Sequence, residues 1–480
     1  MKRIILSCMF IGTSIVAIAQ DISGNWQGTA DVMGQKLRAV FHITKENSKY
    51  TVTFDSPDQG GFGLHCEDLT LTGDSVVIKM NFIAGSYNGK WNGSDEIAGA
   101  LSQGGQHFVL PLKQITGENK VAPAPKSSAT TPKPQTPQPP FNYISEEVAY
   151  DNPFQQVRLA GTLTKPTVKT KFPAVILITG SGPQDRDETI GMHKSFWVIA
   201  DYLTKQGIAV LRVDDRGVGN SSGDFFAANS ADFATDVMAG IRYLKTRKDI
   251  DTAKIGLIGH SEGGIIAPYV AARSKDVAFI VMLAGPVVGG KKTMYYQAVE
   301  KPLANFSEHD RNAYGQFYNQ MLKVALDDEA AKDINTYTQN TFNNWKKQQP
   351  DSTVKNLIHG SDESVIKSFS EGFRDLTRTW WRFFLTYDIA KDVRKLKIPV
   401  FALNGEKDEQ VDPRANLTAI KKILTQNKNP DFKVYEVPGV NHLFQRCKVC
   451  GSVKEYLALE ETFDPLTLSI IGNWIKEQIK

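Results

Sequence analysis

The spacing of hydrophobic and polar positions changes twice along the chain and divides it into three parts. In residues 20–117 apolar and polar positions alternate, as they do from Leu37 to Ile43 and from Tyr50 to Phe54. A period of two is typical of β-strands with one buried face. Clusters of Gly, Asn and Asp, such as Asn92–Asp95, separate these runs and indicate turns. We therefore predict a small all-β domain over residues 20–117.

Residues 118–140 have no periodic pattern. They are rich in Pro, Thr and Ser and carry no large apolar side chain, so they cannot bury a core. We predict an extended, semi-rigid Pro/Thr-rich linker.

From residue 141 onward, short apolar runs alternate with segments of helical spacing. Residues 146–150 and 156–163 predict two leading strands, and 233–248 and 466–479 have the period of amphipathic helices. Further apolar runs, too short for helices, predict buried strands at 174–178, 208–213, 255–258, 279–283 and 400–403, and residues 432–437 are predicted as the last strand. This alternation predicts an α/β domain over 141–480 with a largely parallel sheet covered on both faces. Such sheets bind ligands beyond the carboxyl ends of their strands.

Strand patterns are missing between about residues 290 and 388, where helix formers and aromatic residues dominate. An insertion of this length between two strands is too long for a simple crossover, so we predict a helical cap. Its last part, Thr379–Leu385, is aromatic and apolar. These side chains either face the substrate or pack the cap against the sheet.

Composition and charge narrow the classes of function. The chain has 480 residues, 41% hydrophobic and 22% charged, which is typical of a globular protein of roughly two to three domains. The net charge is +4, and Lys2 and Arg3 supply two of these charges, so that 4 − 2 leaves +2 without the first segment. No basic stripe accompanies this charge, and we expect no nucleic-acid partner.

The first 19 residues have the pattern of a secretory signal peptide. Lys2 and Arg3 precede a mostly apolar run from Ile4 to Ile18, and Ala17–Ala19 offers a small-x-small cleavage site. A membrane anchor is the alternative, but the apolar run is short for a bilayer. We expect an exported protein, periplasmic or secreted, without a membrane span.

The candidate chemistry centres on residues 254–273, KIGLIGHSEGGIIAPYVAAR. An apolar run at 255–258 predicts a strand, Gly259–Gly264 a sharp turn, and the following Ala/Ile/Val-rich segment a helix. A Ser at the apex of such a turn is strained, and its hydroxyl projects off the end of the sheet. The helix N-terminus behind it favours developing negative charge. We therefore predict that Ser261 is a nucleophile; the alternative is a Gly-rich loop with a capping Ser.

A nucleophilic Ser needs a base that is oriented by a carboxylate. With this kind of turn the chain order is Ser, then acid, then His. Only His442 follows the strand at 400–403, and a loop can carry it back over Ser261. The competing histidines are set aside because His309 and His359 lie in the predicted cap and His260 points away as the neighbour of the nucleophile.

The acid lies in the segment 404–412, which follows a buried strand and offers four carboxylates. Asp408 is three residues past the turn at Gly405. Asp412 precedes Pro413 and has the position of a helix N-cap. We assign the acid to Asp408 and keep Asp412 as the alternative.

The tetrahedral intermediate also needs backbone donors for its oxyanion. One is the N–H of Glu262, directly after the nucleophile. We assign the other to Ser181 in the loop after the strand at 174–178, because Pro183 has no N–H and Gly180 makes the turn. Gly182 is the alternative.

Five motifs in order carry a family resemblance: GSGPQDRDE (180–188), DDRGVGNSSG (214–223), GHSEGG (259–264), NGEKDEQV (404–411) and GVNHLFQ (439–445). With them, residues 141–480 resemble the α/β-hydrolase superfamily and are most similar to bacterial carboxylic ester hydrolases related to the serine aminopeptidase-like group. The resemblance implies that fold, with a helical cap, and Ser-His-Asp chemistry on esters. Thr179 stands where this family usually has His, which affects hydrogen bonding in that loop. Charged residues in the first two motifs are expected to hold loops through ion pairs: Asp185, Arg186, Asp214, Asp215 and Arg216.

The remaining Cys and His residues indicate no metal or cofactor. Cys447 and Cys450 have no second ligand pair nearby for zinc. Both a local disulfide beside His442 and two free thiols fit the sequence. The histidines of the β domain are scattered singly, and we interpret them as surface or core residues without a catalytic role: His42, His65 and His107.

We conclude that the sequence predicts an exported serine hydrolase that cleaves small-molecule carboxylic esters through an acyl-enzyme, without cofactor or metal. An aminopeptidase or amidase of the same fold is the second hypothesis. The third is a binding protein in which the β domain acts and the hydrolase is vestigial. The partner of the β domain is unknown.

Overall fold

A computed structural model of the chain describes residues 21–480 except 33–34, 47–48, 57–60, 67, 81–84, 104–105, 116–132, 169–170 and 451–452. The predicted signal peptide, residues 1–19, and most of the predicted linker, residues 118–132, lie outside the described residues. Their predictions therefore stay predictions.

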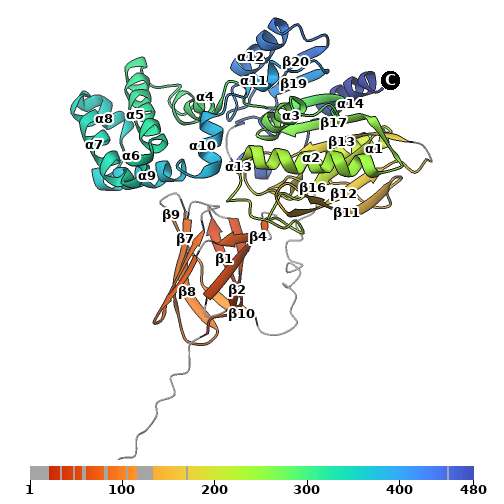
Figure 1. Ribbon diagram of the computed structural model, residues 1–480. Helices are drawn as coiled ribbons and strands as arrows, with labels where there is room; N and C mark the ends of the chain where they lie inside the picture. Colours follow the sequence, from red (N-terminus) through yellow and green to blue (C-terminus); the bar gives the residue numbers. More distant parts are fainter. Residues whose placement is uncertain are drawn as a thin grey trace, which may run out of the picture.

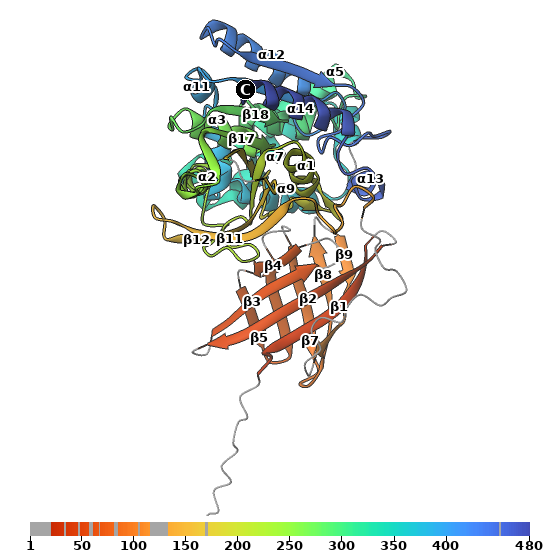
Figure 2. The same ribbon diagram turned by 90° about the vertical axis from the view of Figure 1, so that its right-hand side faces the viewer.

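In the described residues the first unit is a ten-stranded antiparallel sheet with the order β4-β3-β2-β1-β10-β8-β7-β6-β5, and β9 pairs with β8. Strand β3 contacts β5 and β4 contacts β6, so the sheet curls back on itself (Figure 2). Its interior is filled by large buried side chains, among them Trp26, Phe41 and Tyr87. The strands are β1 (Gly24–Val32), β2 (Gln35–Glu46), β3 (Lys49–Ser56), β4 (Gly61–Cys66), β5 (Asp68–Thr72), β6 (Ser75–Met80), β7 (Gly85–Trp91), β8 (Glu96–Gln103), β9 (Gln106–Val109) and β10 (Leu112–Ile115).

The second unit is built on an eight-stranded sheet with the order β11-β12-β16-β13-β17-β18-β19-β20. Strand β12 is antiparallel to both of its neighbours, β11 and β16. The strands β16, β13, β17, β18, β19 and β20 run parallel, with Ile176 of β13 opposite Leu257 of β17. The strands are β11 (Ile144–Asn152), β12 (Val157–Lys165), β13 (Phe172–Ile178), β16 (Ala209–Val213), β17 (Ile250–His260), β18 (Phe279–Leu283), β19 (Val400–Gly405) and β20 (Phe432–Val437). A separate pair, β14 (Thr189–Ile190) and β15 (His193–Lys194), precedes the first helix.

Helices cover both faces of this sheet because successive strand residues point to opposite sides. Val175 and Leu177 share one buried cluster with α1 (Ser195–Lys205) and α14 (Pro465–Gln478). Ile176 and Ile178 share the other with α2 (Ser230–Thr246), α3 (Gly263–Ala271) and α12 (Pro413–Gln426). Burial on both faces explains the continuous apolar runs of these strands.

A helical insertion follows β18 and ends before β19. Figure 1 shows α5 to α9 as a group beside the sheet, joined to it through α4 and α10. The elements are α4 (Gly290–Tyr295), the π-helical turn η4 (Tyr296–Glu300), α5 (Glu308–Leu326), α6 (Asp328–Lys332), α7 (Ile334–Lys347), α8 (Asp351–Leu357), α9 (Asp362–Asp375), α10 (Thr379–Thr386) and α11 (Ala390–Val393). A further short helix, α13 (Val453–Ala458), precedes α14. The predicted fold class, an α/β sheet with a helical insertion after a small all-β domain, is confirmed.

Within the described residues, no helix combines the length and the apolar character that crossing a bilayer requires. The same residues contain no cluster of His, Cys, Asp and Glu side chains arranged to hold a metal ion.

Candidate active site

Ser261 occupies the turn between β17 and α3 at the carboxyl edge of the parallel strands. Its φ of 51° lies in the left-handed region, which is strained for a residue with a side chain. Its N–H donates to the carbonyl of Leu283 on the neighbouring strand, at 2.8 Å. A Cβ on Gly259 would collide with the backbone of Gly263, so glycine is required for this close strand–helix approach. The turn therefore has the geometry of a nucleophile elbow.

Asp408 and His442 come together beyond the ends of β19 and β20. Asp408 Oδ2 lies 2.8 Å from His442 Nδ1 and accepts from Asn404 Nδ2 at 2.9 Å. Its Oδ1 accepts from the N–H groups of Gln410 and Val411, at 2.8 and 2.9 Å. Because the carboxylate is an acceptor, His442 carries its proton on Nδ1 and leaves Nε2 free to act as a base. Both side chains are buried.

Asp412, the alternative acid, has a different role. Its Oδ1 accepts from the N–H groups of Arg414 and Ala415 at the start of α12, at 3.0 and 3.1 Å. It is thus the N-cap of that helix, as its position before Pro413 indicates. Of the two carboxylates, Asp408 is the one that contacts His442.

Ser261 and His442 belong to neighbouring loops, but the described residues give Ser261 Oγ no hydrogen bond to the imidazole. The residue before the serine, His260, has its ring centroid 4.9 Å from that of His442. Catalytic hydrogen bonds are often long before substrate binds, so this geometry is compatible with a serine–histidine pair. The prediction that His260 points away from the site is wrong, because its side chain lies directly against the His442 loop.

The two residues assigned to the oxyanion hole both lie on this edge. Glu262 stands at the N-cap of α3, and Ser181 is exposed in the loop after β13. Neither backbone N–H donates a hydrogen bond within the part of the chain described. The N–H of Gly180 is already engaged, because it donates to Glu188 Oε1 at 2.8 Å.

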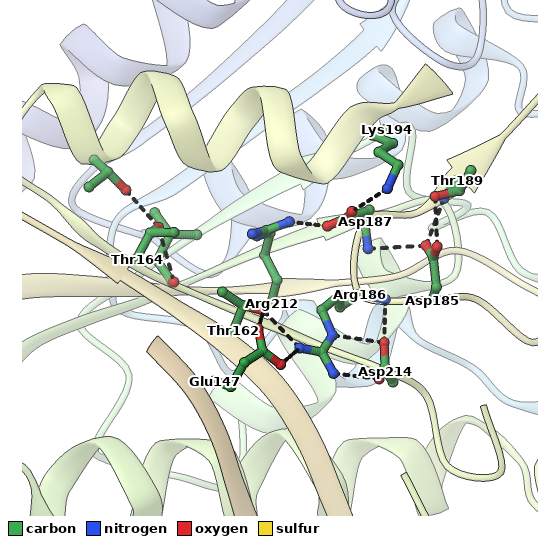
Figure 3. Close-up of polar contacts among 12 residues, drawn as sticks. Glu147, Thr162, Thr164, Asp185, Arg186, Asp187, Thr189, Lys194, Arg212 and Asp214 are labelled. Atoms are coloured by element: carbon green, nitrogen blue, oxygen red, sulfur yellow. Dashed lines mark hydrogen bonds and ion pairs between the residues drawn. The ribbon is translucent and has the colours of Figure 1, made fainter. Parts of the chain in front are cut away.

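Figure 3 shows the ionic contacts that hold the loop between β13 and α1. Arg186 binds Asp214 through two hydrogen bonds, Nε to Oδ1 at 3.0 Å and Nη2 to Oδ2 at 2.7 Å. It also donates to Thr162 and Glu147 of the antiparallel strands. A bidentate arginine–carboxylate pair fixes orientation as well as charge. Arg186 therefore ties this loop to the loop after β16.

Of the other loop residues singled out in the sequence, Arg216 forms the predicted kind of ion pair, whereas Asp215 and Asp185 accept hydrogen bonds from neutral groups. Arg216 pairs with Asp236 of α2 at 2.8 Å. Asp215 accepts from Thr179 Oγ1 at 2.7 Å, and burial raises the pKa of its carboxyl well above the ordinary value. Asp185 accepts from Thr189 Oγ1 at 2.7 Å.

From the sequence, Glu262 was assigned a role only through its backbone N–H, as an oxyanion donor, and the contacts of its side chain were not predicted. The carboxyl is buried, and its Oε1 accepts from Ser230 Oγ at 2.6 Å and from Trp380 Nε1 of α10 at 2.7 Å. Burial raises the pKa of Glu262 to about 7, although these two hydrogen bonds lower it. The residue after the nucleophile thus joins the elbow to α2 and to the cap. Spacing along the chain could not reveal partners this far away.

The cap also contacts the acid loop. Tyr296 in η4 donates from its hydroxyl to the carbonyl of Asp408 at 3.1 Å. Gln297 donates to the carbonyl of Gln410 at 2.8 Å. A small cavity of about 50 Å³ is bounded by Gly180 and Glu262, among other residues. Trp380 belongs to the aromatic segment that was predicted either to face the substrate or to pack the cap against the sheet. Its indole N–H makes a polar contact with Glu262 at the elbow.

Cys447 and Cys450 form a disulfide in the loop after His442. The N–H of Cys447 donates to the carbonyl of Gly439 at 3.3 Å, which closes this loop at its base. Of the two possibilities that the sequence left open, the structure has the bridge.

Comparison with known proteins shows similarity to hydrolases. Residues 191–341 match the family described as serine aminopeptidase, S33, a stretch that includes Ser261 and ends before Asp408 and His442. Esterase EstD of Thermotoga maritima is 28% identical over 367 residues, or 76% of each chain.

Two solved esterases are also similar to this chain. Est1E from Butyrivibrio proteoclasticus, with bound ferulic acid, has a TM-score of 0.41 and 18% identity, and the match covers 69% of this chain and 99% of that one. Esterase PF2001 of Pyrococcus furiosus has a TM-score of 0.42 and 17% identity, with 70% and 92% covered.

The sheet order, the strained elbow and the paired acid and histidine are those of the α/β-hydrolase fold. By sequence, the chain is similar to the serine aminopeptidase, S33 family over residues 191–341 and to esterase EstD over 76% of its length.

Proposed function

We propose that the protein is a serine hydrolase of carboxylic esters that works through Ser261, His442 and Asp408. The observation that carries this proposal is the buried Asp408–His442 contact of 2.8 Å at the same sheet edge as the left-handed Ser261 turn. The ester preference is supported by the similarity to esterase EstD.

In the proposed mechanism Ser261 Oγ attacks the ester carbonyl while His442 Nε2 accepts its proton. Asp408 stabilises the resulting imidazolium through Nδ1. The oxyanion accepts hydrogen bonds from the N–H groups of Glu262 and Ser181. The C–O bond breaks, and His442 donates its proton to the leaving alcohol. Water then attacks the acyl-enzyme by the same route and releases the acid and the free serine.

We further propose that the protein is exported, either to the periplasm or into the medium. The support is the pattern of residues 1–19, together with the Cys447–Cys450 disulfide, because disulfides persist in oxidising compartments. Cell fractionation and N-terminal sequencing test it. Intact protein in the cytoplasm that begins at Met1 would contradict export.

Steady-state kinetics test the ester proposal. We expect turnover of p-nitrophenyl acetate and butyrate and little turnover of aminoacyl p-nitroanilides, because an ester has the better leaving group. Ser261→Ala and His442→Ala should each lower kcat by about 10⁴- to 10⁶-fold. Ser261→Ala should also abolish labelling by a fluorophosphonate. Absence of both turnover and labelling in the wild type would favour a binding function for the β domain.

The two carboxylates of the acid loop offer a matched pair of variants. Asp408→Asn should lower kcat by about 10³- to 10⁴-fold, because the amide cannot stabilise the imidazolium. Asp412→Asn should change kcat less than about threefold, because Asn is also a good N-cap. The opposite ranking in the same p-nitrophenyl acetate assay would move the acid to Asp412.

An aminopeptidase is the second candidate, and the position of one carboxyl group favours it. The Glu262 carboxyl lies beside the nucleophile and bounds the cavity of about 50 Å³, where it could pair with a substrate ammonium. A higher kcat/KM on the anilides than on the esters, lost in Glu262→Gln, would establish this alternative.

A further inference from the structure

One buried side chain, Glu188, lies between the loop after β13 and the nucleophile turn. It is 2% exposed and adopts a left-handed backbone conformation, with φ of 48°. Its Oε1 accepts from the N–H of Gly180 at 2.8 Å and lies 2.9 Å from His260 Nδ1. The residue thus contacts the predicted oxyanion loop and the residue before Ser261 at the same oxygen atom.

The other nitrogen of His260 reaches the third catalytic loop. His260 Nε2 lies 3.0 Å from the backbone carbonyl oxygen of His442, and the His260 side chain is 5% exposed. A chain of three hydrogen bonds therefore runs from Gly180 through Glu188 and His260 to His442. It joins the loops that supply the oxyanion donor, the nucleophile and the base.

The partners of His260 identify its protonation state. A carbonyl oxygen only accepts, so Nε2 carries a proton. The Glu188 carboxylate also accepts, so Nδ1 carries one as well, and the ring is an imidazolium. Burial lowers the pKa of His260, but Glu188 and the His442 carbonyl raise it further, and the net pKa lies above the ordinary value. The charged groups that face the ring are Glu188 and, more distantly, Asp408; His442 is its titratable neighbour.

We propose that Glu188 and His260 are positioning residues, an ion-paired clamp that holds the oxyanion loop and the His442 loop in place around Ser261. This inference rests on the proposed serine hydrolase mechanism. The clamp touches no reacting atom and acts on kcat through the geometry of the residues that do. When His260 loses its proton at high pH, one of its two hydrogen bonds to an acceptor is lost and the clamp loosens.

Two variants of Glu188 separate geometry from charge. Glu188→Ala leaves the Gly180 N–H and His260 Nδ1 without their acceptor, and we expect kcat on p-nitrophenyl acetate to fall about 10- to 100-fold with KM nearly unchanged. Glu188→Gln keeps the shape of the side chain, and its amide oxygen can accept from both the Gly180 N–H and a protonated His260 Nδ1, as Glu188 Oε1 does. Its kcat should lie within about threefold of the wild type.

The pH dependence of kcat reports the charge of His260. The wild type should lose kcat on the alkaline side as His260 deprotonates. In Glu188→Gln this decline should begin at lower pH, because the amide carries no charge to stabilise the His260 imidazolium. A purely structural contact would not shift this limb of the profile.

His193→Gln is the matched control. His193 is also a buried histidine with both ring nitrogens bonded, to Thr462 Oγ1 at 2.8 Å and to the Tyr456 carbonyl at 2.9 Å. Its loss should lower the urea midpoint but leave the alkaline decline of kcat in place. Circular dichroism establishes that each variant is folded, and if Glu188→Ala fails to fold, the Glu188→Gln pH profile decides alone.

The outcomes distinguish this inference from the proposed function. Suppose that Ser261→Ala is inactive. If folded Glu188→Ala then keeps the wild-type kcat, or if Glu188→Gln keeps the wild-type alkaline decline, the proposed clamp is wrong and the proposed mechanism stands. If Ser261→Ala retains full ester turnover, the proposed mechanism itself fails.

Discussion

At the scale of single residues, the carboxyl of Glu262 is a buried group whose ionisation opposes folding. It has no cationic partner among the contacts described for it; Ser230 and Trp380 are neutral donors. Burial without a countercharge disfavours the carboxylate, and this explains why the pKa of Glu262 rises to about 7.

This shift predicts a pH-dependent stability. The folded pKa lies above the value of 4.5 for an ordinary Glu, so the folded state binds the proton more tightly than the unfolded state. The stabilisation is complete below pH 4.5 and is lost as the pH rises through 7, by up to about 3 kcal/mol. In urea unfolding at pH 5 and pH 8, Glu262→Gln should show a smaller decrease in the free energy of unfolding than the wild type. Equal decreases in the two proteins would contradict the shifted pKa.

The candidate site was predictable where local pattern determines chemistry. Ser261 lies in a strand–turn–helix signature, and Asp408 and His442 each follow a predicted strand. Each of the three is therefore recognisable from its own neighbourhood in the sequence. The side chains of Glu188 and Glu262 were not predictable. Their partners, His260 and Trp380, lie 72 and 118 positions away, and only the folded chain brings them together.

At the scale of elements, the strands of the α/β unit were easier to predict than its helices. Continuous apolar runs such as 255–258 mark strands buried on both faces. The helices between β18 and β19 were foreseen only as one helical region, because their boundaries depend on caps such as Ser307 and Asp327. The strand order of the β domain was not predictable either, since β1 pairs with β10 across nearly the whole domain.

The loop that carries His442 gives a prediction at this scale. The Cys447–Cys450 bridge closes a very short loop, so chain entropy gives it a stabilisation of only about 2 kcal/mol. The turn is also held by Asn441, whose Oδ1 accepts from the N–H groups of Leu443 and Gln445, both at 3.0 Å. The variant with Cys447→Ser and Cys450→Ser should therefore have a lower urea midpoint but a kcat within about threefold of the wild type.

Ester turnover of the wild type with and without dithiothreitol provides the matching measurement. A loss of kcat beyond tenfold in both experiments would mean that the bridge, and not Asn441, holds His442 in place.

At the scale of the whole molecule, the junction between the two units differs from the predicted linker. Residues up to 140 were expected to be an extended linker, but its last part is bound to the α/β unit. Lys133 Nζ donates to the Leu459 carbonyl at 2.6 Å, and Gln135 Nε2 donates to the Phe463 carbonyl at 2.7 Å. Gln135 Oε1 accepts in return from the Phe463 N–H at 2.9 Å. Residues 133–140 thus belong structurally to the hydrolase.

This attachment decides where the chain can be shortened. A protein that begins at Lys133 keeps these hydrogen bonds, and we expect it to fold and to hydrolyse p-nitrophenyl acetate with a kcat within about threefold of the full chain. A protein that begins at Phe141 leaves the Phe463 N–H and the Leu459 carbonyl without partners, which should lower the free energy of unfolding by about 2 to 4 kcal/mol. Urea unfolding and ester turnover of the two shortened chains measure the difference. Equal midpoints would mean that the linker's end adds no stability, and loss of activity in both would mean that the β domain contributes to the site.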